Sequence, residues 1–73
     1  MATINGVSEI TGKVWKIEAA VGDRVEDGDT VVILESMKME VPVQSQTSGV
    51  ITAICVNEGD SVSEGDTVFT LET

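Results

Sequence analysis

The pattern of apolar and polar positions predicts β-strands along most of the chain. The segments "KVWKIEAAV", which begins at Lys13, and "VITAICV", which begins at Val50, are rich in Val, Ile and small residues. Neither segment carries the apolar stripe of an amphipathic helix. Gly-Asp pairs at 22–23, 28–29, 59–60 and 65–66 separate such runs, which is typical of turns. The pattern therefore predicts an all-β fold, a flattened barrel or small sandwich of short strands.

The chain contains one segment twice. Residues 12–36 align with residues 49–73 at an offset of 37 positions (49 − 12), and the match is strongest between "GDRVEDGDTVVILES" and "GDSVSEGDTVFTLET". A solenoid needs three or more repeats, so two copies do not predict one. We expect instead two sheets related by a pseudo-twofold axis.

The alignment of the two copies also predicts which side chains face the core. Val32 and Leu34 align with apolar residues of the second copy, whereas Ile33 aligns with the polar Thr70. We therefore expect Val32 and Leu34 in the core and Ile33 on a less buried face. Pro42 lacks a backbone N–H, so it fits an edge strand or a bulge.

The segment "ESMKMEVPV", residues 35–43, joins the two copies as a predicted hairpin with Met37 and Lys38 at its turn. Tight two-residue turns usually contain Asn or Gly, because they require positive φ. Met-Lys is a poor choice for such a turn, and a local conflict of this kind often marks a functional site. The repeat contains no second copy of this dipeptide.

Two registers of the hairpin are compatible with the apolar pattern. A turn at 37–38 places Glu35 opposite Glu40, which is unfavourable because like charges repel. A turn at 36–37 places Glu35 opposite Lys38 instead, and local charge slightly favours it. A shift by two residues keeps the same side chains inside, so periodicity does not separate the two.

Composition narrows the chemistry of the single small domain that we expect over residues 1–73. The chain has no histidine, which removes the commonest metal ligand and the commonest general base. Its only cysteine, Cys55, cannot form an internal disulfide and is expected to be an inert strand residue. Val25 stands at a ligand position of a possible EF-hand loop, so no calcium site is expected. The only aromatic residues are Trp15 and Phe69, so Val, Ile, Leu and Ala must build most of the core.

Charge and hydropathy exclude two further classes of partner. A net charge of −9 argues against nucleic acid, whose phosphates would repel this surface. The longest strongly apolar run, residues 31–34, is far too short to cross a membrane. The N-terminal "MATINGVSEI" does not read as a signal peptide, so we expect a cytoplasmic protein.

The combination of "MKM" at a hairpin with a two-copy β domain resembles the attachment site of biotinyl domains, the carriers of biotin-dependent carboxylases. The resemblance covers nearly the whole chain. It implies a flattened barrel of two four-stranded antiparallel sheets with quasi-twofold symmetry, and it places Lys38 at the hairpin tip as the residue that carries biotin in amide linkage. The chain resembles the free-standing biotin/lipoyl attachment proteins, and an excised carrier domain of a carboxylase subunit would look the same.

The resemblance implies a carrier and not an enzyme. A biotin protein ligase would load Lys38, and the partners would be biotin carboxylase and carboxyltransferase components. Met37 and Met39 would be the flanks that the ligase reads, although Met39 could equally pack over one end of the barrel. Glu35 and Glu40 are either solvated charges or further ligase contacts.

Two other functions are compatible with the sequence. Lipoyl carriers of the 2-oxoacid dehydrogenase type also modify a hairpin lysine and would carry lipoate, but they usually show Asp-Lys-Ala where this chain has Met-Lys-Met. The other alternative is an unmodified interaction module whose acidic hairpin docks on a basic partner. In that case Lys38→Arg would leave function intact.

Overall fold

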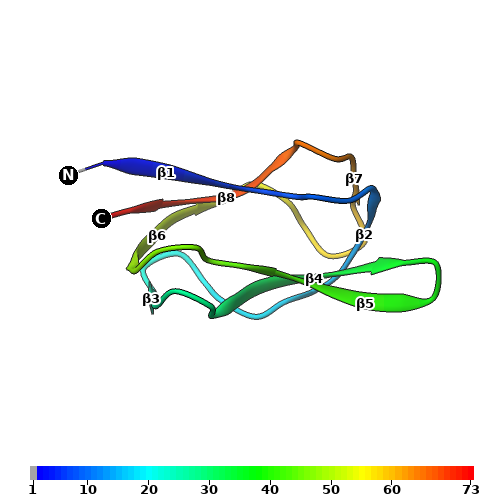
Figure 1. Ribbon diagram of the computed structural model, residues 1–73, viewed down its shortest axis with the longest axis horizontal. Coiled ribbons are helices and arrows are strands. Elements are labelled where there is room, and N and C mark those ends of the chain that lie inside the picture. Colours follow the sequence, from blue (N-terminus) through cyan, green and yellow to red (C-terminus); the bar gives the residue numbers. More distant parts are fainter. Residues whose placement is uncertain (1) are drawn as a thin grey trace.

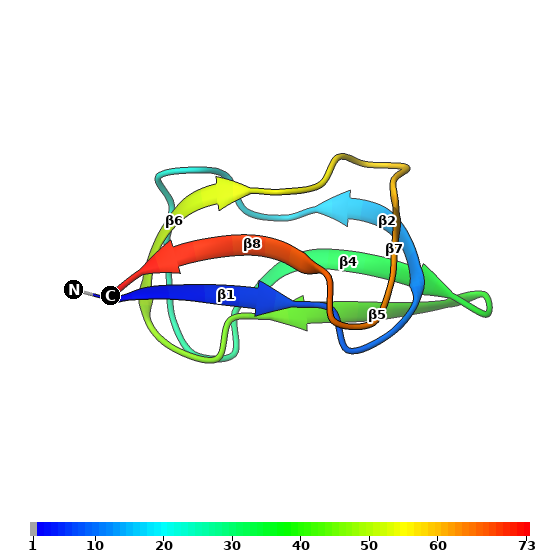
Figure 2. The ribbon, with the colours of Figure 1, turned by 90° about the horizontal axis from the view of Figure 1, so that it is seen from above.

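The computed structural model describes residues 2–73, which form two four-stranded antiparallel sheets (Figures 1 and 2). The strands are β1 (Thr3–Val7), β2 (Gly12–Ile17), β3 (Arg24–Val25), β4 (Thr30–Ser36), β5 (Met39–Gln44), β6 (Gly49–Ile54), β7 (Ser61–Val62) and β8 (Thr67–Glu72). One sheet has the order β1-β8-β6-β3 and the other β5-β4-β2-β7. The all-β fold and its two four-stranded sheets are as predicted. No helix within residues 2–73 is long and apolar enough to span a bilayer.

The predicted quasi-twofold symmetry is confirmed strand by strand. Replacing each strand of one sheet by its equivalent at the offset of 37 converts β1-β8-β6-β3 into β5-β4-β2-β7. The irregularities in strand pairing are also equivalent in the two sheets. The β2–β4 register shifts between Val14 and Lys16, and the β6–β8 register shifts between Ile51 and Ala53, at the equivalent positions.

The two halves are interlocked by hydrogen bonds. The backbone N–H of Gly22 donates to the carbonyl of Ile51, and the equivalent Gly59 donates to Val14, both at 2.8 Å. Each bond joins a Gly-Asp turn of one half to a strand of the other. The halves are therefore parts of one cooperative unit and not two separate subdomains.

The symmetry extends upstream of the two repeated segments, residues 12–36 and 49–73. Ser8 and Ser45 are equivalent (45 − 8 = 37), both are 1% exposed, and each donates its hydroxyl to the carbonyl two residues ahead. Each also exchanges backbone hydrogen bonds with a Gly-Asp turn. Ser45 accepts from Gly28 and donates to Asp29, both at 2.8 Å. These bonds hold the chain in place where it leaves β5.

The four Gly-Asp pairs form turns, as predicted. In each, the glycine has a φ between 91° and 96°, a region that other residues rarely adopt. The aspartate then accepts a hydrogen bond from the backbone N–H three residues earlier at 2.8–2.9 Å. This side-chain bond is the reason that Asp follows Gly in all four turns.

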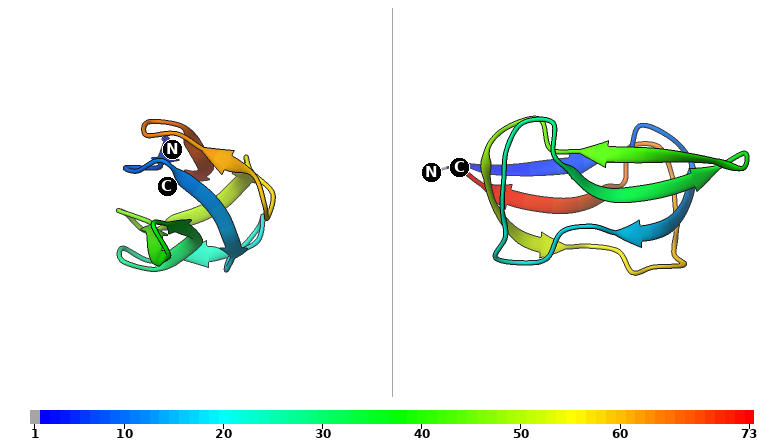
Figure 3. Two further views of the ribbon diagram at one scale, coloured as in Figure 1. Left: turned by 90° about the vertical axis from the view of Figure 1, so that its right-hand side faces the viewer. Right: turned by 90° about the horizontal axis from the view of Figure 1, so that it is seen from below.

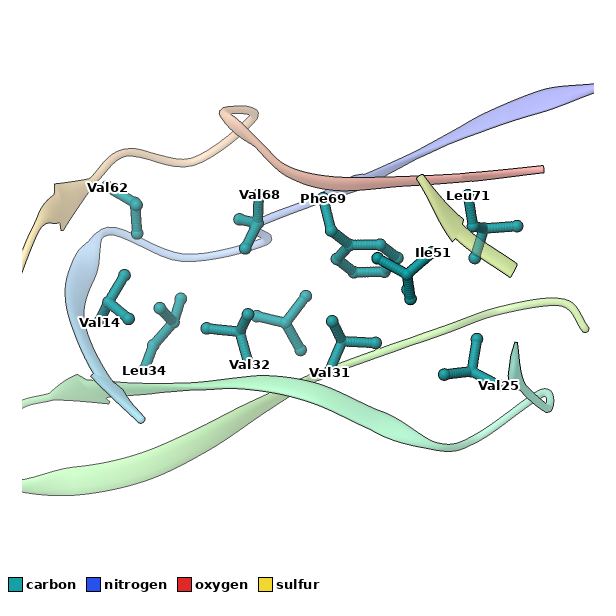
Figure 4. Close-up of a cluster of buried hydrophobic side chains, with 11 residues drawn as sticks. Val14, Val25, Val31, Val32, Leu34, Ile51, Val62, Val68, Phe69 and Leu71 are labelled. Carbon is teal, nitrogen blue, oxygen red and sulfur yellow. The ribbon is translucent and has the colours of Figure 1, made fainter. Parts of the chain in front are cut away.

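The core lies between the sheets, with side chains of both halves pointing toward one another (Figure 4). It consists of Val14, Val25, Val31, Val32, Leu34, Val43, Ile51, Val62, Val68, Phe69 and Leu71. Val32 and Leu34 are fully buried and Ile33 is half-buried, as predicted. Val31 is also fully buried, although it precedes Val32 directly. The register shift between Thr30 and Val32 breaks the alternation there.

Two smaller predictions have different outcomes. Pro42 lies on β5, an edge strand, as predicted, so its missing N–H leaves no gap in a central ladder. Cys55 is exposed and lies one residue beyond β6, so its assignment to a strand is wrong. Its N–H still donates to the carbonyl of Val68 at 2.8 Å, but the regular pairing of β6 with β8 has already ended.

Candidate functional site

The site is the hairpin formed by β4 and β5. Ser36 pairs with Met39 and Glu35 pairs with Glu40, so the turn residues are 37–38. The register with the turn at 36–37 is therefore wrong, although local charge favours it. The hydrogen bonds of Ser45 with the 28–29 turn explain the outcome, because a shift by two residues would break them at the far end of β5.

The turn has an unusual backbone. Met37 and Lys38 have φ of 52° and 65°, and they are the only non-glycine residues between Ala2 and Thr73 with positive φ. Positive φ at both central residues defines the type I′ turn, whose twist matches that of the flanking strands. The conformation costs each side chain on the order of 1 kcal/mol. The conflict that the sequence predicted is thus present in the structure.

The side chains of the turn are open to solvent. Lys38 is exposed, Met37 is 93% exposed and Met39 is 66% exposed. The prediction that Met37 is exposed is confirmed. Packing of Met39 over the barrel end is wrong, because most of its surface is exposed. The tip of the β4–β5 hairpin extends beyond the other strands (Figure 3).

Few local interactions restrain Lys38. The ion pairs found among residues 2–73 are Lys16 with Glu18 and Arg24 with Glu26, and neither includes Lys38. No hydrogen bond of its side chain is found within the same residues. The amine is therefore available to another molecule.

Acidic side chains lie directly behind the turn. Glu35 and Glu40 are both exposed and face each other across β4 and β5. On its other side Glu35 faces Lys13 of β2. A row of charged side chains therefore lies between the tip and the rest of the sheet. It consists of Lys13, Glu35 and Glu40.

The base of the hairpin is fixed by two contacts that no local sequence pattern predicts. The hydroxyl of Ser36 donates to the carbonyl of Thr11 at 3.1 Å. A Cβ at Gly12 would lie 2.8 Å from the carbonyl oxygen of Glu35, so only glycine allows this approach. The signal for Gly12 was its identity with Gly49 in the repeat. Ser36 carries no such signal, because its partner is a backbone carbonyl.

Within residues 2–73 no three His, Cys, Asp or Glu side chains come together as metal ligands do. The hairpin tip lies at one end of a molecule of 36 × 18 × 18 Å, and the start of β1 and the end of β8 lie at the other end (Figure 1). What the structure offers is an exposed lysine at the tip of a projecting β-hairpin.

Comparison with known proteins identifies this architecture. A family described as "Biotin-requiring enzyme" matches residues 3–71. The chain belongs to this biotin/lipoyl family. The biotin/lipoyl attachment protein of Bacillus subtilis (strain 168) is 43% identical over 46 residues, which are 63% of this chain and 63% of that protein. A biotinylated protein TB7.3 homolog of Mycobacterium leprae (strain TN) is 38% identical over 50 residues, 68% of this chain and 70% of that protein.

The fold of this biotin/lipoyl domain is also found in a solved structure. The crystal structure of the Kluyveromyces lactis urea carboxylase matches with a TM-score of 0.94 and 43% identity. The match covers 99% of this chain and 6% of the carboxylase chain. The same two-sheet domain is therefore built into a much larger carboxylase.

Proposed function

We propose that residues 1–73 form one carrier domain in which Lys38 is joined to biotin and serves a biotin-dependent carboxylase. The observation that carries the proposal is the backbone of the turn. The only two non-glycine residues with positive φ in the described chain stand side by side, and one of them is an exposed, unpaired lysine. Asn or Gly would adopt this turn with less strain, so the presence of Met-Lys supports a role in presenting the amine.

The attachment needs an enzyme from outside the domain. A lysine amine attacks a carbonyl only after it has lost its proton, and no described side chain bonds to the Lys38 amine to take that proton. A biotin protein ligase would supply both deprotonation and an activated biotinyl adenylate. The Nζ atom forms a bond to the acyl carbon, AMP leaves, and the ammonium group gives up two protons and keeps one as the amide N–H. The domain is thus a substrate of the ligase.

The flanks of the turn would contact that ligase. Met37 and Met39 present most of their surface to solvent on either side of Lys38. Exposed, flexible thioethers are well suited to a partner pocket. Glu35 and Glu40 would meet basic groups of the ligase at the next position along the strands.

The β4–β5 hairpin would then act as the base of a tether. Bound biotin would supply a carrier for a carboxyl group between a biotin carboxylase and a carboxyltransferase. The domain would hold the tether at the end opposite the start of β1 and the end of β8 (Figure 1). Tethering raises the local concentration at each partner site to the order of millimolar. The similarity to a urea carboxylase domain supports this role.

The test is intact-mass spectrometry of the chain co-expressed with a biotin protein ligase. The wild-type chain is expected to gain one biotinyl group, and Lys38→Arg none. Lys13→Arg and Lys16→Arg are matched controls that retain the modification, since these are the only other lysines. Circular dichroism of Lys38→Arg should match the wild type, because Lys38 is exposed. Biotin on Lys38→Arg, or an unmodified wild-type chain, would refute the proposal.

Lipoate is the second candidate, because the similar Bacillus subtilis protein is a biotin/lipoyl attachment protein. The same mass measurement separates the two groups. A lipoyl adduct on Lys38 in place of biotin would reassign the domain to the lipoyl carriers.

A further inference from the structure

The outward surfaces of the two sheets differ in character. On the sheet that carries the hairpin, Trp15, Ile33 and Pro42 occupy neighbouring positions on β2, β4 and β5. Ile33 pairs with Pro42 on one side and with Lys16 on the other, and Trp15 is the extra residue at the bulge before Lys16. We call Trp15, Ile33 and Pro42 the Trp15 face. Trp15 is 48% exposed, which is high for the only tryptophan of a small protein.

The other sheet shows that the fold does not require this apolar face. The equivalent positions at the offset of 37 are Thr52, Thr70 and Asn5, all polar. The hydroxyls of Thr52 and Thr70 lie 2.7 Å apart in a hydrogen bond. The same backbone thus accepts polar side chains at all three positions, so packing does not explain the tryptophan. Neighbouring apolar side chains that folding does not need to expose favour an interaction surface, whereas a single one does not.

The Trp15 face lies within reach of anything bound at the tip. The Ile33–Pro42 pair is three residue pairs behind Ser36–Met39, about 10 Å along the strands. A standard interface buries about 800 Å² per partner, a disc of roughly 16 Å radius. An interface of that size centred on Lys38 therefore covers the face.

The surface between the face and the tip is charged and hollowed. A shallow hollow adjoins the indole, and it is lined by Lys13, Val14, Trp15, Glu35 and Gly59. Glu40 continues the charged row on β5. An apolar group behind a row with two glutamates and one lysine fits a partner that combines an apolar pocket with basic groups.

We propose that the Trp15 face is a docking surface for the biotin protein ligase that loads Lys38, with the indole in an apolar pocket and Glu35 and Glu40 against basic groups. The inference rests on the proposed function. The ligase is the partner that must bring its active site to the lysine amine itself, so its surface must cover the flanks of the hairpin. A carboxylase acts at the far end of the tether and does not need to touch this face.

A second copy of the chain is a poorer occupant. Three side chains bury far less than the roughly 800 Å² per partner of a stable dimer. A net charge of −9 on each copy also opposes association.

The test measures biotinylation of the apo-domain by a purified ligase with biotin and ATP. Trp15→Thr introduces the residue that stands at the equivalent position 52. It is expected to raise the KM for the domain about tenfold, with kcat within about twofold, because tryptophan is a frequent hot spot of interfaces. Ile33→Thr, which copies position 70, should raise KM by a smaller factor. Val50→Thr, a change at an exposed apolar residue of the other sheet, is the matched control and should leave KM unchanged.

The outcomes separate the docking surface from the proposed function. An unchanged KM in Trp15→Thr and Ile33→Thr, with normal labelling of Lys38, would overturn the docking surface alone. A fall in kcat at constant KM, or an equal rise of KM in Val50→Thr, would overturn it as well. A defect of Trp15→Thr only in carboxylase turnover would give the face to that enzyme and overturn the proposal. Failure of the ligase to label even the wild-type domain would refute the carrier function, and the docking surface with it.

Discussion

The two ends of the molecule have equivalent strand pairs, but a turn joins the paired strands at only one of them. At the hairpin end, Glu35 pairs with Glu40 and the chain continues through the 37–38 turn. At the terminal end, the equivalent pair is Glu72 with Thr3 (72 − 35 = 37; 40 − 3 = 37). There the two strands lie side by side as the N- and C-terminal segments of the described chain (Figure 2).

This difference distinguishes the features that the fold requires from the features that it does not require. Strands β8 and β1 pair at the terminal end without a covalent turn, so the pairing of β4 with β5 does not depend on the identity of residues 37–38. Features that both ends share, such as the bulges and the Gly-Asp turns, are structural. Features found at one end only are the functional candidates. These are the strained Met-Lys turn, the facing glutamates and the Trp15 face.

The largest effect on stability is expected where the two ends share a close contact. A Cβ at Gly12 would lie 2.8 Å from the carbonyl oxygen of Glu35, and one at Gly49 would lie 2.6 Å from that of Glu72. We expect Gly12→Ala and Gly49→Ala each to lower the free energy of unfolding by about 1–3 kcal/mol. Gly49→Ala should cost more, because its Cβ would also meet Leu71 at 2.6 Å. Urea denaturation measures both.

The same pair of variants distinguishes the ends by function. Gly12→Ala displaces the strand that leads to the turn, so it should also slow biotinylation of the folded protein. Gly49→Ala acts at the other end and should leave the rate of labelling per folded molecule unchanged. Equal losses of labelling in both variants would contradict the division between a structural end and a functional end.

A smaller effect, in the opposite direction, is expected from relief of the strained turn. Asn tolerates positive φ better than Met, so Met37→Asn should raise the free energy of unfolding by about 0.5–1 kcal/mol. Its labelling by the ligase should fall, because a flank of the lysine is lost. Met39→Asn is the control, since Met39 has no positive φ and should gain no stability. Equal gains in both variants would show that strain at the turn is not the cause.

Much of the fold follows from the repeat, because two similar segments must form similar structures. The burial of Val32 and Leu34 is predicted from the repeat. The four turns are predicted from their Gly-Asp pairs, and the edge position of Pro42 from its missing N–H. The position of the bulges is not predicted, since a bulge depends on pairing with another strand and leaves no local pattern. The sequence does not predict the burial of Val31 for that reason. It does not predict the end of β6 before Cys55 either, because the length of β6 depends on its pairing with β8.

The site was predicted from its motif more than from local physics. Charge alone favoured the turn at 36–37, and the resemblance to biotinyl domains selected the turn at 37–38 that the structure contains. The bonds that hold this register involve Ser45, ten residues from Glu35 along the chain (45 − 35 = 10). No pattern within the hairpin reports on them. The Trp15 face was missed too, because its three residues lie on three different strands.

The smallest expected effect concerns the two glutamates behind the tip. Thr3 stands where Glu40 would be if the ends were identical, so Glu40→Thr copies the terminal end into the hairpin. Removal of one like charge should raise the free energy of unfolding by a few tenths of a kcal/mol, since both carboxylates are exposed. The reciprocal change Thr3→Glu places a carboxylate opposite Glu72 and should lower stability by a similar amount. Both effects should shrink as salt rises, because screening weakens the repulsion. Urea denaturation at low and high ionic strength measures them, and a gain for Glu40→Thr that persists in high salt would show that its origin is strand propensity and not charge.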